Sequence, residues 1–235
     1  MSWKYKALLH AKKEDPHESV GLLINKKGKK IYMPCNNLAY DKSETFLLDP
    51  DDYIKSEKVG EIIGVIHSHP YTAPIASQAD KISCENVNLP FYIVNPKTEK
   101  WGYIEPSGYK PPILGREYVW GLADCWTLVR DWYKQEKNIN LRDWDRPRTP
   151  EEFFYNPMFE KCAEDTGFRL LKHDEKLENG DLLFMSILGK GLNHVAIFVD
   201  GEVLHHLSDR LSCKEPYNEW LLKCTGKRLR YVQKS

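Results

Sequence analysis

The first half of the chain alternates apolar runs with polar turns, a pattern that predicts a mixed domain of helices and strands. Residues 3–11 repeat apolar side chains at helical spacing. Polar, glycine-containing turns bound the apolar runs that follow. The segments predicted as strands are 18–24, 30–34, 44–49 and 61–69, with a helix over 77–87 and a late hairpin over 91–96 and 100–106.

In the second half, the pattern places helices before strands. Residues 124–135 carry Leu128, Val129, Trp132 and Tyr133 at helical spacing, with Asp124 suited to cap the helix. Helical pieces are predicted at EEFF (151–154) and MFEKCAEDTG (158–167), and strands at GDLLFMSI (180–187), HVAIFVD (194–200) and EVLHHL (202–207). The whole chain is therefore predicted to be an α+β protein.

A proline- and glycine-rich stretch, EPSGYKPPILG, separates the two halves and shows no periodicity. A chain of 235 residues is long enough for two domains. We therefore expect an N-terminal domain over residues 1–105, a linker over 106–114 and a C-terminal domain over 115–235.

Composition excludes several classes of partner. Lys plus Arg and Asp plus Glu both number 34, so the net charge is zero. A net charge of zero does not favour binding to nucleic acid or anionic lipid. No stretch is long and apolar enough for a signal-peptide core or a membrane span, so we expect synthesis to end in the cytoplasm. The six cysteines form no CxxC pair, which favours reduced thiols.

The segment GVIHSHPYTAPIASQAD (64–80) has the composition of a metal site. His67 and His69, two residues apart at the end of an extended run, project from one face, and the helix that starts near Ser77 brings Asp80 back toward them. Two imidazoles and one carboxylate are the three ligands expected of catalytic zinc with an open fourth position for water. A bare HxH in a polar loop is the alternative interpretation.

A water held in this way needs a base. Glu18, just before the apolar run SVGLLI, is the best candidate, and Glu14 on a charged segment is a weaker one.

These residues, Glu18 in PHESVGLL, then HSHP, six residues, Ser77 and Asp80, resemble the JAMM (MPN+) metallopeptidase motif with no departure in ligands or spacing. The resemblance covers about residues 1–105. It implies zinc on His67, His69 and Asp80, Glu18 as general base, Ser77 as a donor to the tetrahedral oxyanion, and hydrolysis of peptide or isopeptide bonds.

The second candidate site surrounds Cys125, at the start of a predicted helix, where the aligned backbone amides stabilise a thiolate. Asp124 opposes this by its charge, so a histidine must take the proton. His194, at the start of a strand, can do so, and His205 or His206 on the next strand can orient it.

The order Cys125, GDLLF, HVAIFVDGEVLHH is similar to that of the NlpC-type cysteine peptidases, a papain-like family of cell-wall hydrolases. The resemblance implies Cys125 as nucleophile, His194 as base and His205 as the third residue. Trp126 and Thr127 depart from the family, which usually has a small Ser-Gly pair after the cysteine. The substrate is then expected to be the stem peptides of peptidoglycan.

The two domains in this order resemble the tail assembly proteins of lambda-like long-tailed phages. That resemblance implies a protein made in the host cytoplasm, other tail-tip proteins as partners, a place at the virion tail tip, and delivery to the host periplasm. Two hypotheses follow: a hydrolase with two peptidase sites, or an assembly module that docks on tail-tip proteins and in which zinc stabilises the fold. A cellular deubiquitinase-like enzyme would not explain the second domain.

Overall fold

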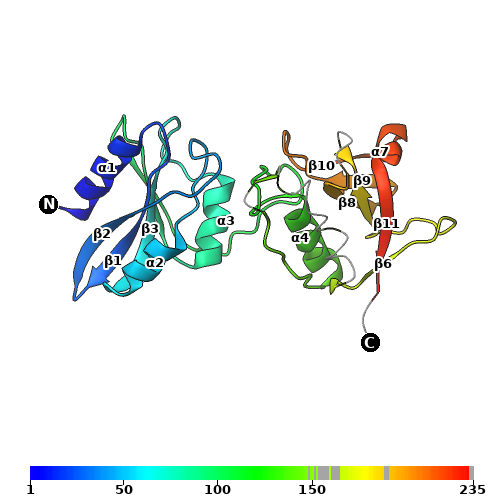
Figure 1. Ribbon diagram of the computed structural model, residues 1–235, viewed down its shortest axis with the longest axis horizontal. Coiled ribbons are helices and arrows are strands. Elements are labelled where there is room, and N and C mark those ends of the chain that lie inside the picture. The colour runs from blue at the N-terminus through cyan, green and yellow to red at the C-terminus, as the bar shows by residue number, and fades with distance from the viewer. Residues whose placement is uncertain (148, 151, 153–158, 160–164, 188–190, 233–235) are drawn as a thin grey trace. The chain divides into compact units, whose positions relative to one another are not determined.

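The computed structural model describes residues 1–147, 149–150, 152, 159, 165–187 and 191–232. It divides into two compact units, Met1–Lys110 and Pro111–Ser235, each with its own sheet and helices (Figure 1). The division falls inside the segment predicted as a linker.

The N-terminal unit is a five-stranded sheet between helices. Its elements are α1 (Trp3–Glu14), β1 (Val20–Lys26), β2 (Lys29–Cys35), α2 (Pro50–Glu57), β3 (Glu61–Ser68), α3 (Gln78–Val87), β4 (Phe91–Val94) and β5 (Trp101–Ile104). The strand order is β2-β1-β3-β4-β5, and β3 with β4 is the parallel pair. Ala7 of α1 packs on Leu23 and Ile66, whereas Cys84 of α3 packs on Leu22 and Val65. Each face of the sheet is thus covered by helix, with β3 in the middle.

The C-terminal unit places helices on a six-stranded antiparallel sheet. Its elements are α4 (Cys125–Lys137), β6 (Phe168–Leu170), β7 (Leu182–Met185), β8 (His194–Val199), β9 (Glu202–His205), β10 (Cys213–Pro216), α7 (Glu219–Cys224) and β11 (Thr225–Tyr231). The order is β10-β9-β8-β7-β11-β6. Leu128 and Trp132 of α4 share a core with Val195 and Ile197, and Leu221 of α7 packs on Ala196 across the sheet.

One prediction about the N-terminal half was wrong, and one helix was not predicted. Residues 44–49 form no strand; only Leu48 makes an isolated bridge, to Asn37. The side-chain carbonyl of Asn37 accepts from the Leu47 N–H, so a side chain organises this loop, and Phe46 packs on His67. Helix α2 was not predicted, although Asp49 caps it.

The helical pieces predicted at 151–154 and 158–167 lie largely outside the described residues.

The segment predicted as a linker is bonded at both ends to the unit beside it. The Glu85 carboxylate accepts the backbone N–H of Tyr109 at 2.9 Å. The buried Arg116 guanidinium donates to the Pro112 carbonyl at 2.9 Å and to Asp131 on α4 at 2.7 Å. Hydrogen bonds therefore attach each end of this segment to the unit beside it.

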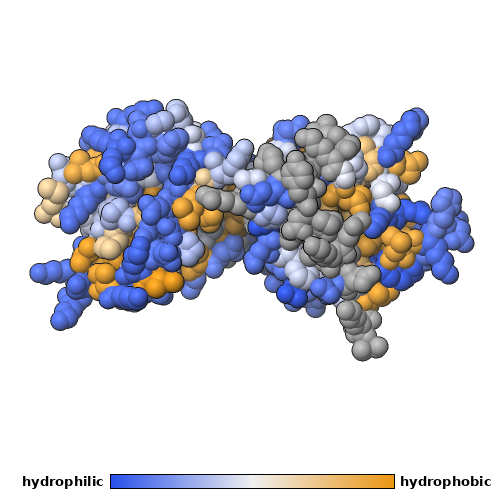
Figure 2. Space-filling model, viewed as in Figure 1, coloured by the Kyte–Doolittle hydropathy of each residue, from blue (hydrophilic) through white to orange (hydrophobic). Residues whose placement is uncertain are grey.

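On the face drawn in Figure 2, hydrophilic residues cover most of the described surface, and apolar residues form separate patches. Among the described residues, no helix is long and apolar enough to cross a membrane.

Candidate metal centre and candidate cysteine active site

The metal centre begins at the end of the central strand. His67 is in β3 and His69 follows it, and both side chains are buried. Their Nε2 atoms lie 3.1 Å apart. The Nδ1 atom of His69 faces the Ala73 carbonyl at 3.2 Å, so the proton of the neutral ring sits on Nδ1 and leaves Nε2 free to bind a metal.

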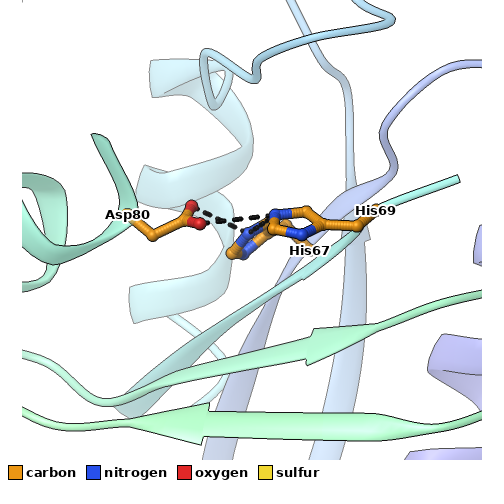
Figure 3. A group of neighbouring side chains, drawn as sticks. All are labelled: His67, His69 and Asp80. Carbon is orange, nitrogen blue, oxygen red and sulfur yellow. Dashed lines mark hydrogen bonds and ion pairs between the residues drawn. The ribbon is translucent and has the colours of Figure 1, made fainter. Parts of the chain in front are cut away.

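Asp80 completes this cluster from the first turn of α3 (Figure 3). Its Oδ1 atom lies 2.9 Å from His67 Nε2, and its Oδ2 atom lies 3.3 Å from His69 Nε2. Burial alone would raise the pKa of Asp80, but the two imidazoles hold it well below its usual range. The carboxylate is therefore charged and directed at both rings.

The donor set fits a divalent metal such as zinc. One ligand atom from each of His67, His69 and Asp80 lies within 4.8 Å of the others. Two tetrahedral ligands at the usual zinc distance of about 2.0–2.1 Å are themselves separated by about 3.3 Å. The separations of 2.9–3.3 Å are near that value, so a small outward movement would admit the ion.

Glu18 lies beside this cluster and Glu14 does not. The Glu18 carboxylate is buried, and its Oε1 atom lies 3.9 Å from His69 Nε2. Burial raises its pKa to about 8; the charge of His69 opposes that rise and the charge of Asp80 adds to it. Glu14 instead lies 3.7 Å from His10 on α1.

Ser77 caps α3, as its position in the sequence predicts. Its hydroxyl donates to Asp80 Oδ2 at 2.8 Å, and its backbone N–H donates to the same oxygen at 2.8 Å. The hydroxyl would have to leave Asp80 in order to donate to a substrate oxygen.

Asn95 holds the loop between His69 and Ser77, a role that no motif in the sequence predicts. Its buried side-chain amide donates to the carbonyls of His69 at 2.9 Å and Thr72 at 2.8 Å. Gly102 of β5 lies so close to this loop that a Cβ atom there would meet the Pro74 carbonyl oxygen at 1.8 Å. The loop is thus fixed from two sides.

In the C-terminal unit, Cys125 is the first residue of α4 and is buried. Asp124 caps the helix by accepting the Thr127 N–H at 2.9 Å. Burial raises the pKa of the Cys125 thiol to about 12, and the charge of Asp124 adds to the rise. Cys125 shares a core with Val195 at the start of β8, and the backbone N–H of Val195 opposes the rise in pKa.

Arg146 offsets the charge of Asp124. Its guanidinium donates to both carboxylate oxygens, Nε to Oδ2 at 2.8 Å and an Nη to Oδ1 at 3.1 Å. Both side chains are buried. This pairing offsets part of the electrostatic objection that the sequence DC raises against a thiolate at Cys125, because Arg146 lowers the pKa of the thiol by less than Asp124 raises it.

His194 and His205 meet where β8 begins and β9 ends. Their ring centroids are 5.4 Å apart with the rings edge-on. Burial lowers the pKa of both imidazoles, most strongly at His194. His206 packs instead on Tyr118, with ring centroids 5.0 Å apart. Of the two histidines that the residue pattern left open, His205 is the one whose ring contacts His194.

Two family models match the chain, one in each unit. The model of the prokaryotic homologs of the JAB domain matches residues 3–103, and that of the NlpC/P60 family matches residues 115–230. Among solved structures, a protein of Desulfitobacterium hafniense aligns with 43% of this chain and 76% of its own at 26% identity and a TM-score of 0.37. A JAB1/MPN domain protein from Archaeoglobus fulgidus aligns with 44% and 84% at 20% identity and a TM-score of 0.30.

Fold and site together define the class: an α+β protein in which a JAB-like domain with a His-His-Asp cluster precedes an NlpC/P60 domain. Two curated relatives extend over most of the chain. The tail tip assembly protein K of Escherichia phage N15 is 34% identical over 227 residues, 95% of this chain and 92% of that protein. Its namesake in Escherichia phage lambda is 31% identical over 175 residues, 73% and 83%. This chain belongs to the tail tip assembly protein K family.

Proposed function

We propose that the protein is a two-site peptidase of the phage tail tip. Its C-terminal unit cleaves a peptide bond in the stem peptides of peptidoglycan, and its N-terminal unit is a zinc metallopeptidase that acts on a protein or peptide during tail assembly. The observation that carries the first activity is the shared core of Cys125 and Val195, which places the cysteine near His194 at the start of β8, and the ring contact of His194 with His205 at the end of β9. Membership in the protein K family supports the location at the virion tail and other tail-tip proteins as partners.

The cysteine site works by nucleophilic catalysis. The thiol of Cys125 gives its proton to His194 as the sulfur attacks the carbonyl carbon of the scissile bond. His194 then protonates the leaving amine as the C–N bond breaks, and a water hydrolyses the thioester, which restores the thiol. Since burial keeps the Cys125 thiol protonated and the His194 imidazole neutral, the proton moves when substrate is bound.

The metal site assigns distinct roles to five residues. His67, His69 and Asp80 would hold the ion, which when bound acidifies a water and polarises the scissile carbonyl. Glu18 takes the proton of the attacking water and passes it to the leaving amine, a role for which its position beside His69 suits it. Ser77 donates to the oxyanion once its hydroxyl turns from Asp80.

The first experiment is mass spectrometry of Gram-negative peptidoglycan incubated with the protein, with a Cys125→Ala variant and with a Cys213→Ala control. New stem-peptide fragments from wild type and the control, but not from Cys125→Ala, would establish a murein endopeptidase and locate the bond. If folded wild type releases no fragments, even in the presence of tail-tip proteins, the cysteine peptidase assignment fails.

A second experiment separates catalysis from docking in the metal unit. Glu18→Gln keeps the three ligands, and Glu14→Gln is the matched control on α1. We expect both variants to retain zinc by elemental analysis, and phage carrying Glu18→Gln alone to lose tail processing or infectivity. Unchanged infectivity of that phage would support the assembly module instead.

A further inference from the structure

Glu215 of β10 makes polar contacts with His205, the third residue proposed for the cysteine site, and with Arg210. The pairing of Cys213 with His205 puts Glu215 two residues along the neighbouring strand. Its Oε1 atom lies 2.6 Å from His205 Nε2 and also accepts from Arg210. The Arg210 nitrogen is 2.8 Å from His205 Nε2, a separation that results when both nitrogens donate to the same Glu215 oxygen.

This geometry fixes the proton of His205. Arg210 and His205 both lower the pKa of Glu215 against the effect of burial, so the carboxylate is charged and can only accept. Two bare lone pairs 2.6 Å apart would repel, which places the His205 proton on Nε2. Since burial keeps His205 neutral, its Nδ1 atom carries no proton.

Two buried ring nitrogens nearby have no partner among the described residues, His205 Nδ1 and His194 Nε2. With the proton of His205 on Nε2, its Nδ1 atom is an acceptor, and a His194 Nε2–H is the donor that would satisfy it. His194 Nδ1 is then bare and able to take a proton. Hydrogen bonds in catalytic groups often tighten only when substrate is bound.

We propose that Glu215 is a positioning residue of the cysteine site: by holding the proton of His205 on Nε2, it leaves His194 with a bare Nδ1 atom for the thiol of Cys125. This inference rests on the proposed peptidase function. Without the carboxylate, Arg210 would donate to His205 Nε2, and the proton of His205 would move to Nδ1. This Nδ1–H would then donate to His194 Nε2, so the proton of His194 would lie on Nδ1, the nitrogen that must accept the proton of the thiol.

The tautomer can be observed directly. In protein labelled with ¹⁵N-histidine, long-range ¹H–¹⁵N spectra distinguish the two neutral forms, and a His205→Gln variant assigns the signal. We expect the Nε2–H form of His205 in wild type and the Nδ1–H form in Glu215→Leu. Arg210→Gln keeps Glu215 and should keep the Nε2–H form. Glu202→Gln, which removes a carboxylate paired to Lys214 on the same sheet, is the control.

Function is measured in two ways. With peptidoglycan fragments as substrate, Glu215→Leu should lower kcat about 10- to 100-fold and leave KM unchanged, the size expected when a partner that orients a functional histidine is lost. The rate at which iodoacetamide alkylates Cys125, followed by peptide mapping at pH 7, should fall in the same variant. If Glu215→Leu fails to fold, Glu215→Gln, which keeps the shape of the side chain, takes its place. This variant should lower kcat and the alkylation rate by less than is expected of Glu215→Leu.

A wild-type His205 in the Nδ1–H form would overturn the inference. So would a Glu215→Leu variant that changes tautomer but keeps the kcat and the alkylation rate of wild type. If wild type cleaves no peptidoglycan, the proposed function fails, and the tautomer and alkylation rate then decide the inference by themselves.

Discussion

The ion pair between Arg146 and Asp124 provides a direct test of the electrostatics around Cys125. Replacing Arg146 by Met keeps the length of the side chain and removes its charge. Among the described residues, the carboxylate of Asp124, 1% exposed, would keep the N–H groups of Thr127 at 2.9 Å and Gly121 at 3.2 Å as its donors. Breaking a buried pair in this way costs about 3–5 kcal/mol.

The remaining N–H donors favour the low end of that range, so we expect α4 to lose about 3 kcal/mol of stability. At about 1.4 kcal/mol per factor of ten, its slowest amides would exchange with solvent deuterium at least about 100-fold faster. Hydrogen exchange with mass spectrometry on peptides of residues 125–137 measures this, and peptides of β3 are an internal control.

A second substitution tests whether the charge is the cause. Asp124→Asn keeps an oxygen to cap α4 but carries no charge, so Arg146→Met in that background should cost less than about 1 kcal/mol. The reasoning is refuted if Arg146→Met leaves exchange in α4 unchanged, or if the double variant loses as much stability as Arg146→Met alone.

Three further predictions concern the two sites. Gly102→Ala should push the loop at Pro74 and weaken zinc affinity about 10-fold or more, measured by competition with a chelating dye. Asp80→Asn should lose zinc binding in the same assay while α3 remains helical by circular dichroism. Burial lowers the pKa of His206 from 6.5 to about 4, so the unfolded chain gains a proton first as the pH falls, and about 3 kcal/mol of stability present above pH 6.5 is lost by pH 4. Melting curves of His206→Gln should be less sensitive to pH over that range.

The sequence predicted those parts of the sites that depend on local spacing. Side chains alternate between the two faces of a strand, so His67 and His69 lie on one face. Ser77 is a typical N-cap residue and predicts the start of the helix that carries Asp80. Asp124 before an apolar helical stripe predicts where α4 begins.

The supporting residues could not be predicted in this way, because their partners are distant in the sequence. Arg146 is 22 residues from Asp124, and Asn95 is 26 from His69. Glu215 depends on the register between β9 and β10, which hydrophobic pattern specifies weakly in the half-exposed strand CKEP. The segment 44–49 has the apolar content of a strand, but only Phe46 and Leu48 pack on the core, Leu47 is exposed, and Leu48 alone makes a bridge.

The capping box of α3 has a consequence for the order in which the N-terminal unit matures. Ser77 holds one carboxylate oxygen of Asp80 by two hydrogen bonds that belong to the helix start itself. The ligand is therefore oriented by folding alone, and capturing an ion requires no segment to become ordered. If the cluster takes up zinc as proposed, the ion need not be loaded when the chain is made, because Asp80 is already oriented by the start of α3.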